Sequence, residues 1–364
     1  MHNFSKLIAT TGAFAGLFLS SSAFAGHNDK VVYQVMPADE GNVWIFDKVE
    51  NKTSHGIEIV EFVDSAYAGN GWYASTLAGI FGQGVIPFWD HYYGDIAWTH
   101  AGDYNWTQII DVNAPLNSTW QMDAGPCKTY DVERIGGATV NGPTGEFANP
   151  WAYNFYFMPD ENVRCADAPV QQVSFAEGVG PVQMHRADSV SDLLFARVDG
   201  EVVAQGPGQT EVDANGVALT VALVSDALVQ PHPIYCFTTP CPQPSTTLRF
   251  AMILENLGSS TQTFGFDYDN DGTVDADTVW EFDIFDERNN YVGSYSDQFT
   301  GPDEIEAITL APGEREVVLL EMPAVTNTGA LLEGNYQGVA IFRGAYADRS
   351  GFSKLDVNFT VARN

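Results

Sequence analysis

Five aspartates lie within one loop of eleven residues, between two segments that we expect to be strands. The loop reads Asp267-Tyr268-Asp269-Asn270-Asp271-Gly272-Thr273-Val274-Asp275-Ala276-Asp277. Calcium prefers about six to eight oxygen ligands, and carboxylates at the first, third and fifth loop positions can surround it when a glycine at the sixth turns the chain. Crowded carboxylates repel one another unless a cation neutralises them. The spacing therefore predicts a calcium site.

The predicted ligands are four carboxylates and one backbone carbonyl. They are the side chains of Asp267, Asp269, Asp271 and Asp275 and the carbonyl oxygen of Thr273. The loop, residues 267–278, ends at Thr278, where an EF-hand has a bidentate Glu, and no helices flank it. We therefore expect modest calcium affinity, with a Kd of ~10⁻⁴ to 10⁻³ M. The alternative is a solvated acidic hairpin, which a chain with 47 carboxylates can easily contain.

The chain has four cysteines, which are Cys127, Cys165, Cys236 and Cys241. An even number in an oxidising compartment indicates disulfides. The short spacing Cys236-Phe237-Thr238-Thr239-Pro240-Cys241 favours a local bridge, and this leaves Cys127 to pair with Cys165. A zinc site is the alternative, but Cys127 and Cys165 lack the close Cys or His neighbours that structural zinc sites use.

Two histidines lie near acidic residues in one strand-rich region. His91 follows Asp90, and His100 and Asp103 come shortly afterwards. Neighbouring residues of a strand point to opposite faces, so Asp90 and His91 favour a structural role over catalysis. The sequence has no Gly-x-Ser-x-Gly, His-Glu-x-x-His or phosphate-binding glycine motif. We therefore expect no enzyme, although a hydrolase whose site combines residues distant in sequence is an alternative.

These residues must be positioned by strands, because short β-branched and aromatic runs alternate with Gly, Pro, Asn and Asp along the whole chain. The expected strands are Asn42 to Val49, Gly56 to Val63, Trp106 to Val112, Lys128 to Ile135, Trp151 to Met158, Leu193 to Val198, Ala218 to Val224, Thr247 to Glu255, Val279 to Asp286, Glu316 to Met322 and Asn335 to Arg343. Asp199-Gly200 predicts a two-residue hairpin turn. Tyr73 to Phe81 is the closest approach to a helical pattern, and its glycines disfavour a helix. The chain is therefore predicted to be all-β.

Aromatic residues are distributed unevenly along the chain. A glycine-rich joint, Gln205-Gly206-Pro207-Gly208, predicts a domain boundary, with one domain over residues 26–205 and another over 206–364. Seven of the eight tryptophans precede this joint: Trp44, Trp72, Trp89, Trp98, Trp106, Trp120 and Trp151. Trp side chains in a β domain usually belong to the core, but an exposed group can stack on sugar rings. Two or three coplanar rings on one open face would indicate glycan binding, whereas seven buried rings would exclude it.

The second domain contains a series of strands and turns with a family resemblance. Its segments are Leu248-Arg249-Phe250-Ala251-Met252-Ile253-Leu254-Glu255-Asn256-Leu257, Phe264-Gly265-Phe266, Val279-Trp280-Glu281-Phe282-Asp283-Ile284-Phe285-Asp286, Tyr291-Val292-Gly293, Leu310-Ala311-Pro312-Gly313-Glu314 and Gly334-Asn335-Tyr336-Gln337-Gly338-Val339. Over about residues 215–345 the chain resembles the BsuPI-type intracellular proteinase inhibitor family. The resemblance implies an immunoglobulin-like β-sandwich and a protein-interaction or proteinase-inhibitor-like role.

The start of the chain predicts export. One positive charge at Lys6 precedes an apolar run from Leu7 to Leu19 and the small residues of Ala23-Phe24-Ala25. This is the pattern of a secretory signal peptide over residues 1–25, with cleavage before Gly26. The apolar run is shorter than the ~20 residues of a membrane-spanning helix, so we expect no membrane span. The mature protein is expected to be secreted or periplasmic.

The chain carries 47 acidic and 16 basic residues, with a net charge of −31. Binding to nucleic acids and anionic membranes depends on Lys and Arg, so the composition disfavours both partners. The sequence thus favours an exported, non-enzymatic binding protein, stabilised by calcium and disulfides, with a protein partner such as a proteinase. The alternative ligand is a glycan bound by the aromatic first domain.

Overall fold

The computed structural model describes residues 31–50, 54–91, 94–100, 106–159, 165, 169–223, 227–230, 247–265, 280–294, 307–323, 325–326, 329–330, 333–344, 346, 351–352 and 354–363. The predicted signal peptide, the calcium-type loop and the Cys236 and Cys241 pair lie outside these residues. Among the described residues the only helix is α1, the single turn Val31–Val35, and the rest of the regular structure is strand. The all-β prediction is therefore confirmed.

The first part of the chain forms one sheet of thirteen strands, which we call the curled sheet. Its strands are β1 (Val43–Glu50), β2 (Ser54–Gly69), β3 (Trp72–Gly79), β4 (Gly82–His91), β5 (Ile96–His100), β6 (Trp106–Asp111), β7 (Thr119–Asp123), β8 (Thr129–Gly136), β11 (Trp151–Phe157), β12 (Val170–Ala176), β13 (Gly180–Arg186), β14 (Ser189–Val198) and β15 (Glu201–Gln205). Their order is β6-β5-β4-β3-β2-β1-β14-β13-β12-β11-β8-β7, and β15 also pairs with β14. A small hairpin, β9 (Val140–Gly142) and β10 (Gly145–Phe147), lies beside this sheet.

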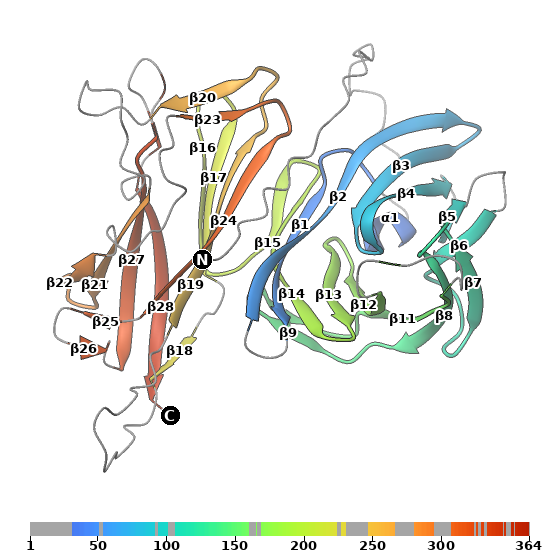
Figure 1. The fold of residues 1–364 in the computed structure, drawn as a ribbon, viewed down its shortest axis with the longest axis horizontal. Coiled ribbons are helices and arrows are strands. Elements are labelled where there is room, and N and C mark those ends of the chain that lie inside the picture. Colours follow the sequence, from blue (N-terminus) through green and yellow to red (C-terminus); the bar gives the residue numbers. More distant parts are fainter. Residues whose placement is uncertain are drawn as a thin grey trace.

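The curled sheet bends until its edge strands β6 and β7 meet (Figure 1). Side chains join these edges: the backbone N–H of Asp123 donates to Thr107 Oγ1 over 2.8 Å, and Thr107 Oγ1 donates to the Asp123 carbonyl over 3.1 Å. The Trp120 indole donates to the Gln108 carbonyl over 3.1 Å. These bonds occupy backbone groups that would otherwise be exposed along two free edges.

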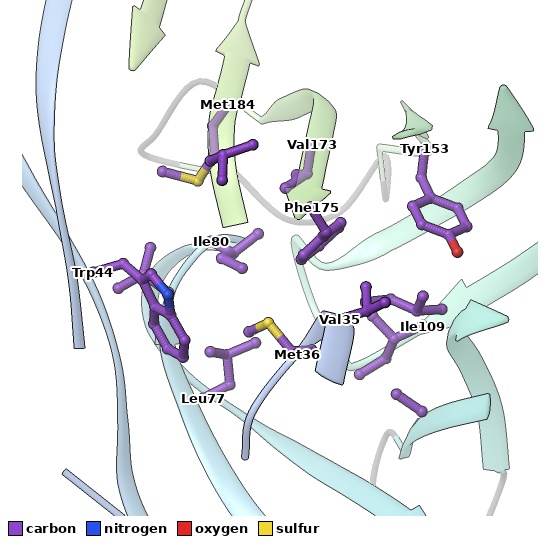
Figure 2. Packing of buried hydrophobic residues seen from close by; sticks show 14 of the residues in the cluster. Val35, Met36, Trp44, Leu77, Ile80, Ile109, Tyr153, Val173, Phe175 and Met184 are labelled. Carbon is purple, nitrogen blue, oxygen red and sulfur yellow. The ribbon is translucent and has the colours of Figure 1, made fainter. Parts of the chain in front are cut away.

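Apolar side chains fill the inside of the curled sheet. Helix α1 lies within the curl (Figure 1). Val35 of the helix lies beside Ile109, and Met36, just after the helix, points toward Leu77 (Figure 2). Trp44 is fully buried there and packs on Gly180, where an added Cβ would come within 2.6 Å of the indole. Each large apolar side chain buried in this way contributes about 1.5–3 kcal/mol. Among the described residues, the interior is a packed core.

The second part of the chain forms two sheets that face each other and enclose a separate core. One sheet has the order β16-β17-β19-β24, and the other has the order β18-β28-β27-β21-β22. Their strands are β16 (Gly208–Val212), β17 (Val217–Leu223), β18 (Ala227–Gln230), β19 (Thr247–Asn256), β21 (Trp280–Asp286), β22 (Tyr291–Ser294), β24 (Arg315–Pro323), β27 (Gly334–Phe342) and β28 (Leu355–Arg363). This part of the chain also contains two two-stranded sheets: β20 (Gln262–Gly265) with β23 (Ala307–Leu310), and β25 (Val325–Thr326) with β26 (Gly329–Ala330). We call this arrangement the sandwich.

The β16-β17-β19-β24 sheet is covered on both of its faces. One face belongs to the sandwich core, and the other packs on the outer side of β1 and β14 through Val43, Ile45, Phe195 and Ile253. Every residue of β17 is accordingly buried. A strand covered on both sides favours a nearly continuous apolar sequence, which explains the run from Val217 to Leu223. Its one polar residue, Thr220, shares a hydrogen bond with Thr210 over 2.8 Å.

Buried ion pairs cross this contact between the curled sheet and the sandwich. Arg197 Nε of β14 lies 2.9 Å from Glu255 Oε2 of β19, and the two side chains are 4% and 3% exposed. Glu255 also accepts from Arg315 Nε over 3.2 Å, and Arg315 contacts Glu61 of β2. Burial lowers the pKa of Arg315, but Glu255 and Glu61 more than reverse this, so the net change is upward. Separately, Arg249 pairs with Asp47.

Local sequence signals agree with the observed strands. Asp199 and Gly200 both have positive φ, 53° and 80°, and they turn β14 into β15 as predicted. Most of the Tyr73 to Phe81 segment lies in strand β3 and not in a helix. Its residues alternate between buried and half-buried positions, as the side chains of a strand do. The sandwich is consistent with the fold that the BsuPI-type resemblance implies, but the family itself stays a prediction.

Candidate functional site

The outer side of β3, β4, β5 and β6 carries a concentration of aromatic side chains. Alternation along each strand directs these residues away from the core: Trp72 of β3, Trp89 and His91 of β4, Trp98 and His100 of β5, and Trp106 of β6. Cross-strand register brings them together, because Trp72 is opposite His91, Trp89 opposite Trp98, and His100 opposite Trp106. We call these six residues the aromatic face.

Trp106 is the centre of the aromatic face. Its ring centroid lies 6.2 Å from that of Trp72, 5.1 Å from that of Trp89 and 5.1 Å from that of His100. The Trp72 and Trp106 planes are inclined by 35°, whereas Trp89 stands at 85° to Trp106. His91 contacts Trp72 edge to face at 4.9 Å. The rings therefore form a folded surface, with Trp72 and Trp106 closest to a common plane.

The tryptophans of the first part divide between core and surface. Trp44 is buried, and Trp120 and Trp151 are partly buried against the core. Trp72, Trp89 and Trp98 are half-buried on the outer side, and Trp106 is 40% exposed. From the sequence, the alternatives are two or three coplanar rings on an open face or seven buried rings. The structure lies between these two arrangements, because several indoles share an outer face but only Trp72 and Trp106 approach a common plane.

The strands position the aromatic face rigidly. The inner residues of the same strands, such as Leu77, Phe88 and Ala97, belong to the packed core, and this fixes the direction of their outward neighbours. The hydrogen bonds between Thr107 and Asp123 hold β6 against β7 next to Trp106. Preorganised rings lose little side-chain entropy when a ligand stacks on them.

Few charges surround the aromatic face. The remaining outward positions nearby are Ala74, Thr76, Pro87, Ile96 and Gln108. In the described strands, outward carboxylates at the border of the face include Asp64 of β2, opposite Thr76, Asp111 at the end of β6, and Asp123 of β7, whose backbone bonds to Thr107. Lys128 donates to the Val85 carbonyl over 2.9 Å at the other end of β4, and burial lowers its pKa. Among the described residues, the outward positions of the face itself are thus aromatic, apolar or neutral polar, and carboxylates lie only at its border.

Asp90 and His91 lie on opposite sides of the sheet, as predicted. Asp90 is 1% exposed and points inward, whereas His91 is half-buried among the outer aromatic rings. His91 Nε2 lies 3.2 Å from the Asn70 carbonyl in the β2–β3 turn. Asp103 lies outside the described residues. The sequence had suggested one His and Asp cluster, but its two histidines belong to the aromatic face.

The aromatic face has a sequence signal that strand-by-strand analysis missed. Trp89-Asp90-His91 and Trp98-Thr99-His100 are two copies of a Trp-x-His tripeptide, nine residues apart in consecutive strands. Residues two apart share one face of a strand. Pairing of two such tripeptides therefore places two tryptophans and two histidines on the same surface.

The other predicted site residues have different outcomes. Cys127 and Cys165 form a disulfide with a Cα separation of 5.6 Å. The calcium ligands Asp267, Asp269, Asp271, Thr273 and Asp275, and the pair Cys236 and Cys241, lie outside the described residues. Within the part that the structure describes, no three His, Cys, Asp or Glu side chains are close enough to hold a metal ion. Calcium binding stays a prediction.

Another candidate surface lies on the sandwich, where an open hollow of ≈ 630 Å³ borders β27, β28 and the turn after β21. Tyr336 stacks on Phe359 at 5.5 Å and 16°. The polar groups around the hollow bond to one another, since Thr360 donates to Asn335 over 3.0 Å and Asn290 to Asp286 over 2.9 Å.

Comparisons with known proteins leave the site as the main guide to function. None of the helices in the described residues is long and apolar enough to cross a membrane. No family model matches the chain, and no curated protein matches its sequence.

Proposed function

We propose that this is an exported, non-enzymatic binding protein that binds glycans through its aromatic face. The observation that carries the proposal is the contact of Trp106 with Trp72, Trp89 and His100 on the outer side of one sheet. Sugar rings present apolar C–H faces surrounded by hydroxyl groups. Indole rings suit the apolar faces, and imidazole, amide and hydroxyl side chains can bond the hydroxyls.

The composition of the surface favours a glycan over a protein. Protein interfaces concentrate Arg and Met beside aromatic residues, with a strongly apolar centre. The outward positions around the six aromatic residues are instead Ala74, Thr76, Pro87, Ile96 and Gln108, none of which is Arg or Met. The tryptophans are therefore set mostly among small and polar side chains, an arrangement that supports a ligand that is itself partly polar.

The predicted export supports an extracellular ligand. The amino-terminal pattern of residues 1–25 is that of a signal peptide, and a structural disulfide such as Cys127–Cys165 is typical of oxidising compartments. The inhibitor-like role of the sandwich and the calcium site at residues 267–278 stay predictions from the sequence. They concern other parts of the chain and can hold alongside glycan binding.

Trp106→Ala and Trp72→Ala test the proposal. We expect each to weaken binding to soluble glycans at least tenfold, or about 1.4 kcal/mol, because each removes a stacking surface at the centre of the face. Isothermal titration against a panel of soluble oligosaccharides measures the loss. Tyr291→Ala is the matched control, since Tyr291 is an aromatic residue of the sandwich that is 58% exposed.

The control must retain wild-type affinity, and thermal melts must show that all three variants fold. Failure of the wild-type protein to bind any glycan of the panel would disprove the proposal. So would wild-type affinity in a variant that lacks both Trp72 and Trp106, because no ring pair would then remain near a common plane.

A further inference from the structure

The aromatic face contrasts in charge with the chain that carries it. The chain has a net charge of −31. None of the outward positions from Trp72 to Thr76 of β3, from Pro87 to His91 of β4, or at Trp98, His100, Trp106 and Gln108 is Asp, Glu, Lys or Arg. General solubility does not require an uncharged surface, because carboxylates could occupy these positions as they do elsewhere. A ligand that neither needs nor tolerates charge accounts for their absence.

Several basic residues of the described chain are used inside the molecule. Arg197 and Arg315 pair with Glu255 between the curled sheet and the sandwich, Arg186 pairs with Glu58, and Arg249 with Asp47. These guanidinium groups neutralise buried or half-buried carboxylates instead of lying at the aromatic face. A carboxylate at the border of the face, such as Asp64, therefore acts on a charged ligand over about a Debye length, about 10 Å at 0.1 M salt.

The angles between the rings restrict the shape of the ligand. A flat crystalline polysaccharide needs several coplanar rings in a row. Trp72 and Trp106 are inclined by 35°, and Trp89 stands at 85° to Trp106. Such a folded surface can contact one chain whose successive sugars are turned relative to one another, but not an extended plane.

From this charge distribution and these ring angles, we propose that the aromatic face selects single, uncharged glycan chains and excludes polyanionic ones. The inference rests on the proposed glycan binding and specifies its ligand class. Uncharged chains experience no net force from the acidic protein. Uronate-rich or sulfated chains are repelled by it and find no Lys or Arg among the outward residues of the face to compensate.

The experiment compares three kinds of probe at two ionic strengths. The probes are soluble neutral oligosaccharides and polysaccharides, polygalacturonate together with a sulfated glycan, and microcrystalline cellulose. Binding is measured by affinity electrophoresis and calorimetry at about 0.01 M and about 1 M salt, where the Debye length is about 30 Å and about 3 Å. We expect neutral binding to be the same at both salts and polyanion binding to be at least tenfold weaker than neutral binding at low salt.

Variants at Asp64 sharpen the measurement. Asp64 is exposed on β2 beside the aromatic face and outside it. Asp64→Asn should raise the affinity for polygalacturonate at low salt, and Asp64→Lys should raise it further, because repulsion is first removed and then replaced by attraction. Neither variant should change neutral binding, and both gains should disappear at high salt.

The outcomes separate this inference from the proposed function. Polygalacturonate bound as tightly as neutral chains at low salt would overturn the selectivity while glycan binding stands. Stronger binding to microcrystalline cellulose than to soluble chains would overturn the single-chain ligand. Absence of binding to every probe would remove the proposed function and this inference with it.

Discussion

The outer side of the curled sheet has two regions with the same backbone geometry and opposite surroundings. At β1, β2 and β14 it is covered by the sandwich and carries Ile45, Phe195 and the charges of Glu61 and Arg197. At β3 to β6 it carries the aromatic face, in which Trp106 is 40% exposed. We call the first region the junction face.

The comparison shows where this chain places charge. The junction face contains charges because each has a partner: Glu255 receives both Arg197 and Arg315. A buried ion without a partner is costly, so such a face can form only if the charges match. The aromatic face has no covering sheet among the described residues, yet it lacks the carboxylates of an ordinary acidic surface. Folding alone does not account for this composition, and the proposed ligand would.

The largest expected effect concerns the junction face. Glu255→Ala leaves Arg197 and Arg315 without their shared carboxylate in a buried setting, and we expect a loss of about 3–5 kcal/mol in the free energy of unfolding. Urea denaturation measures it. Glu281→Ala is the control, because its partner Arg343 is 44% exposed and such pairs contribute about 0–1 kcal/mol. Equal losses in the two variants would contradict the structural role of the junction face.

A smaller effect is expected when stability is measured at the aromatic face. Trp106→Ala removes a side chain that is 40% exposed and outside the core, so we expect it to lower the free energy of unfolding by less than about 1.5 kcal/mol while abolishing most glycan binding. Thermal and urea denaturation provide the measurement. A loss as large as that of Glu255→Ala would mean that the indoles are structural, and the distinction between the two faces would fail.

The smallest effect concerns Asp192 of β14, a largely buried carboxylate that accepts a hydrogen bond from a side-chain amide. Gln183 Nε2 donates to it over 2.7 Å. Burial raises the pKa of Asp192 above its ordinary 3.8, and Gln183 and His185 reduce but do not cancel this rise. Because the pKa is higher in the folded state, protonated Asp192 stabilises the folded protein fully below pH ~3.8. This stabilisation is lost as the pH rises through the pKa of the folded state.

Asp192→Asn should therefore be slightly more stable than the wild type at neutral pH and should lose this advantage below pH ~3.8. Denaturation between pH 3 and 8 would show the difference. Asp131→Asn, at an exposed position of β8, gives the background effect of removing one negative charge. An advantage of Asp192→Asn that equals this background, or that persists in acid, would show that burial of Asp192 has no energetic consequence.

The sequence alone determined the all-β character of this protein and many of its strands. Alternation with period two identifies strands because side chains of a strand point alternately to its two sides, and Asp199-Gly200 identifies a turn because both residues tolerate positive φ. The same rule correctly separates Asp90 from His91. Such signals are local, so they can be read without knowing which strands are neighbours.

Only the tertiary structure decided which outward faces are covered. Trp44 and Trp106 both lie in strands, and their sequence surroundings do not show that one is in the core and the other on the surface. Glu255 and Arg197 are 58 residues apart, so their pairing depends on the packing of two sheets. The aromatic face likewise requires four strands in register. These contacts are non-local, and their free energy exists only once the sheet has curled and the sandwich has packed against it.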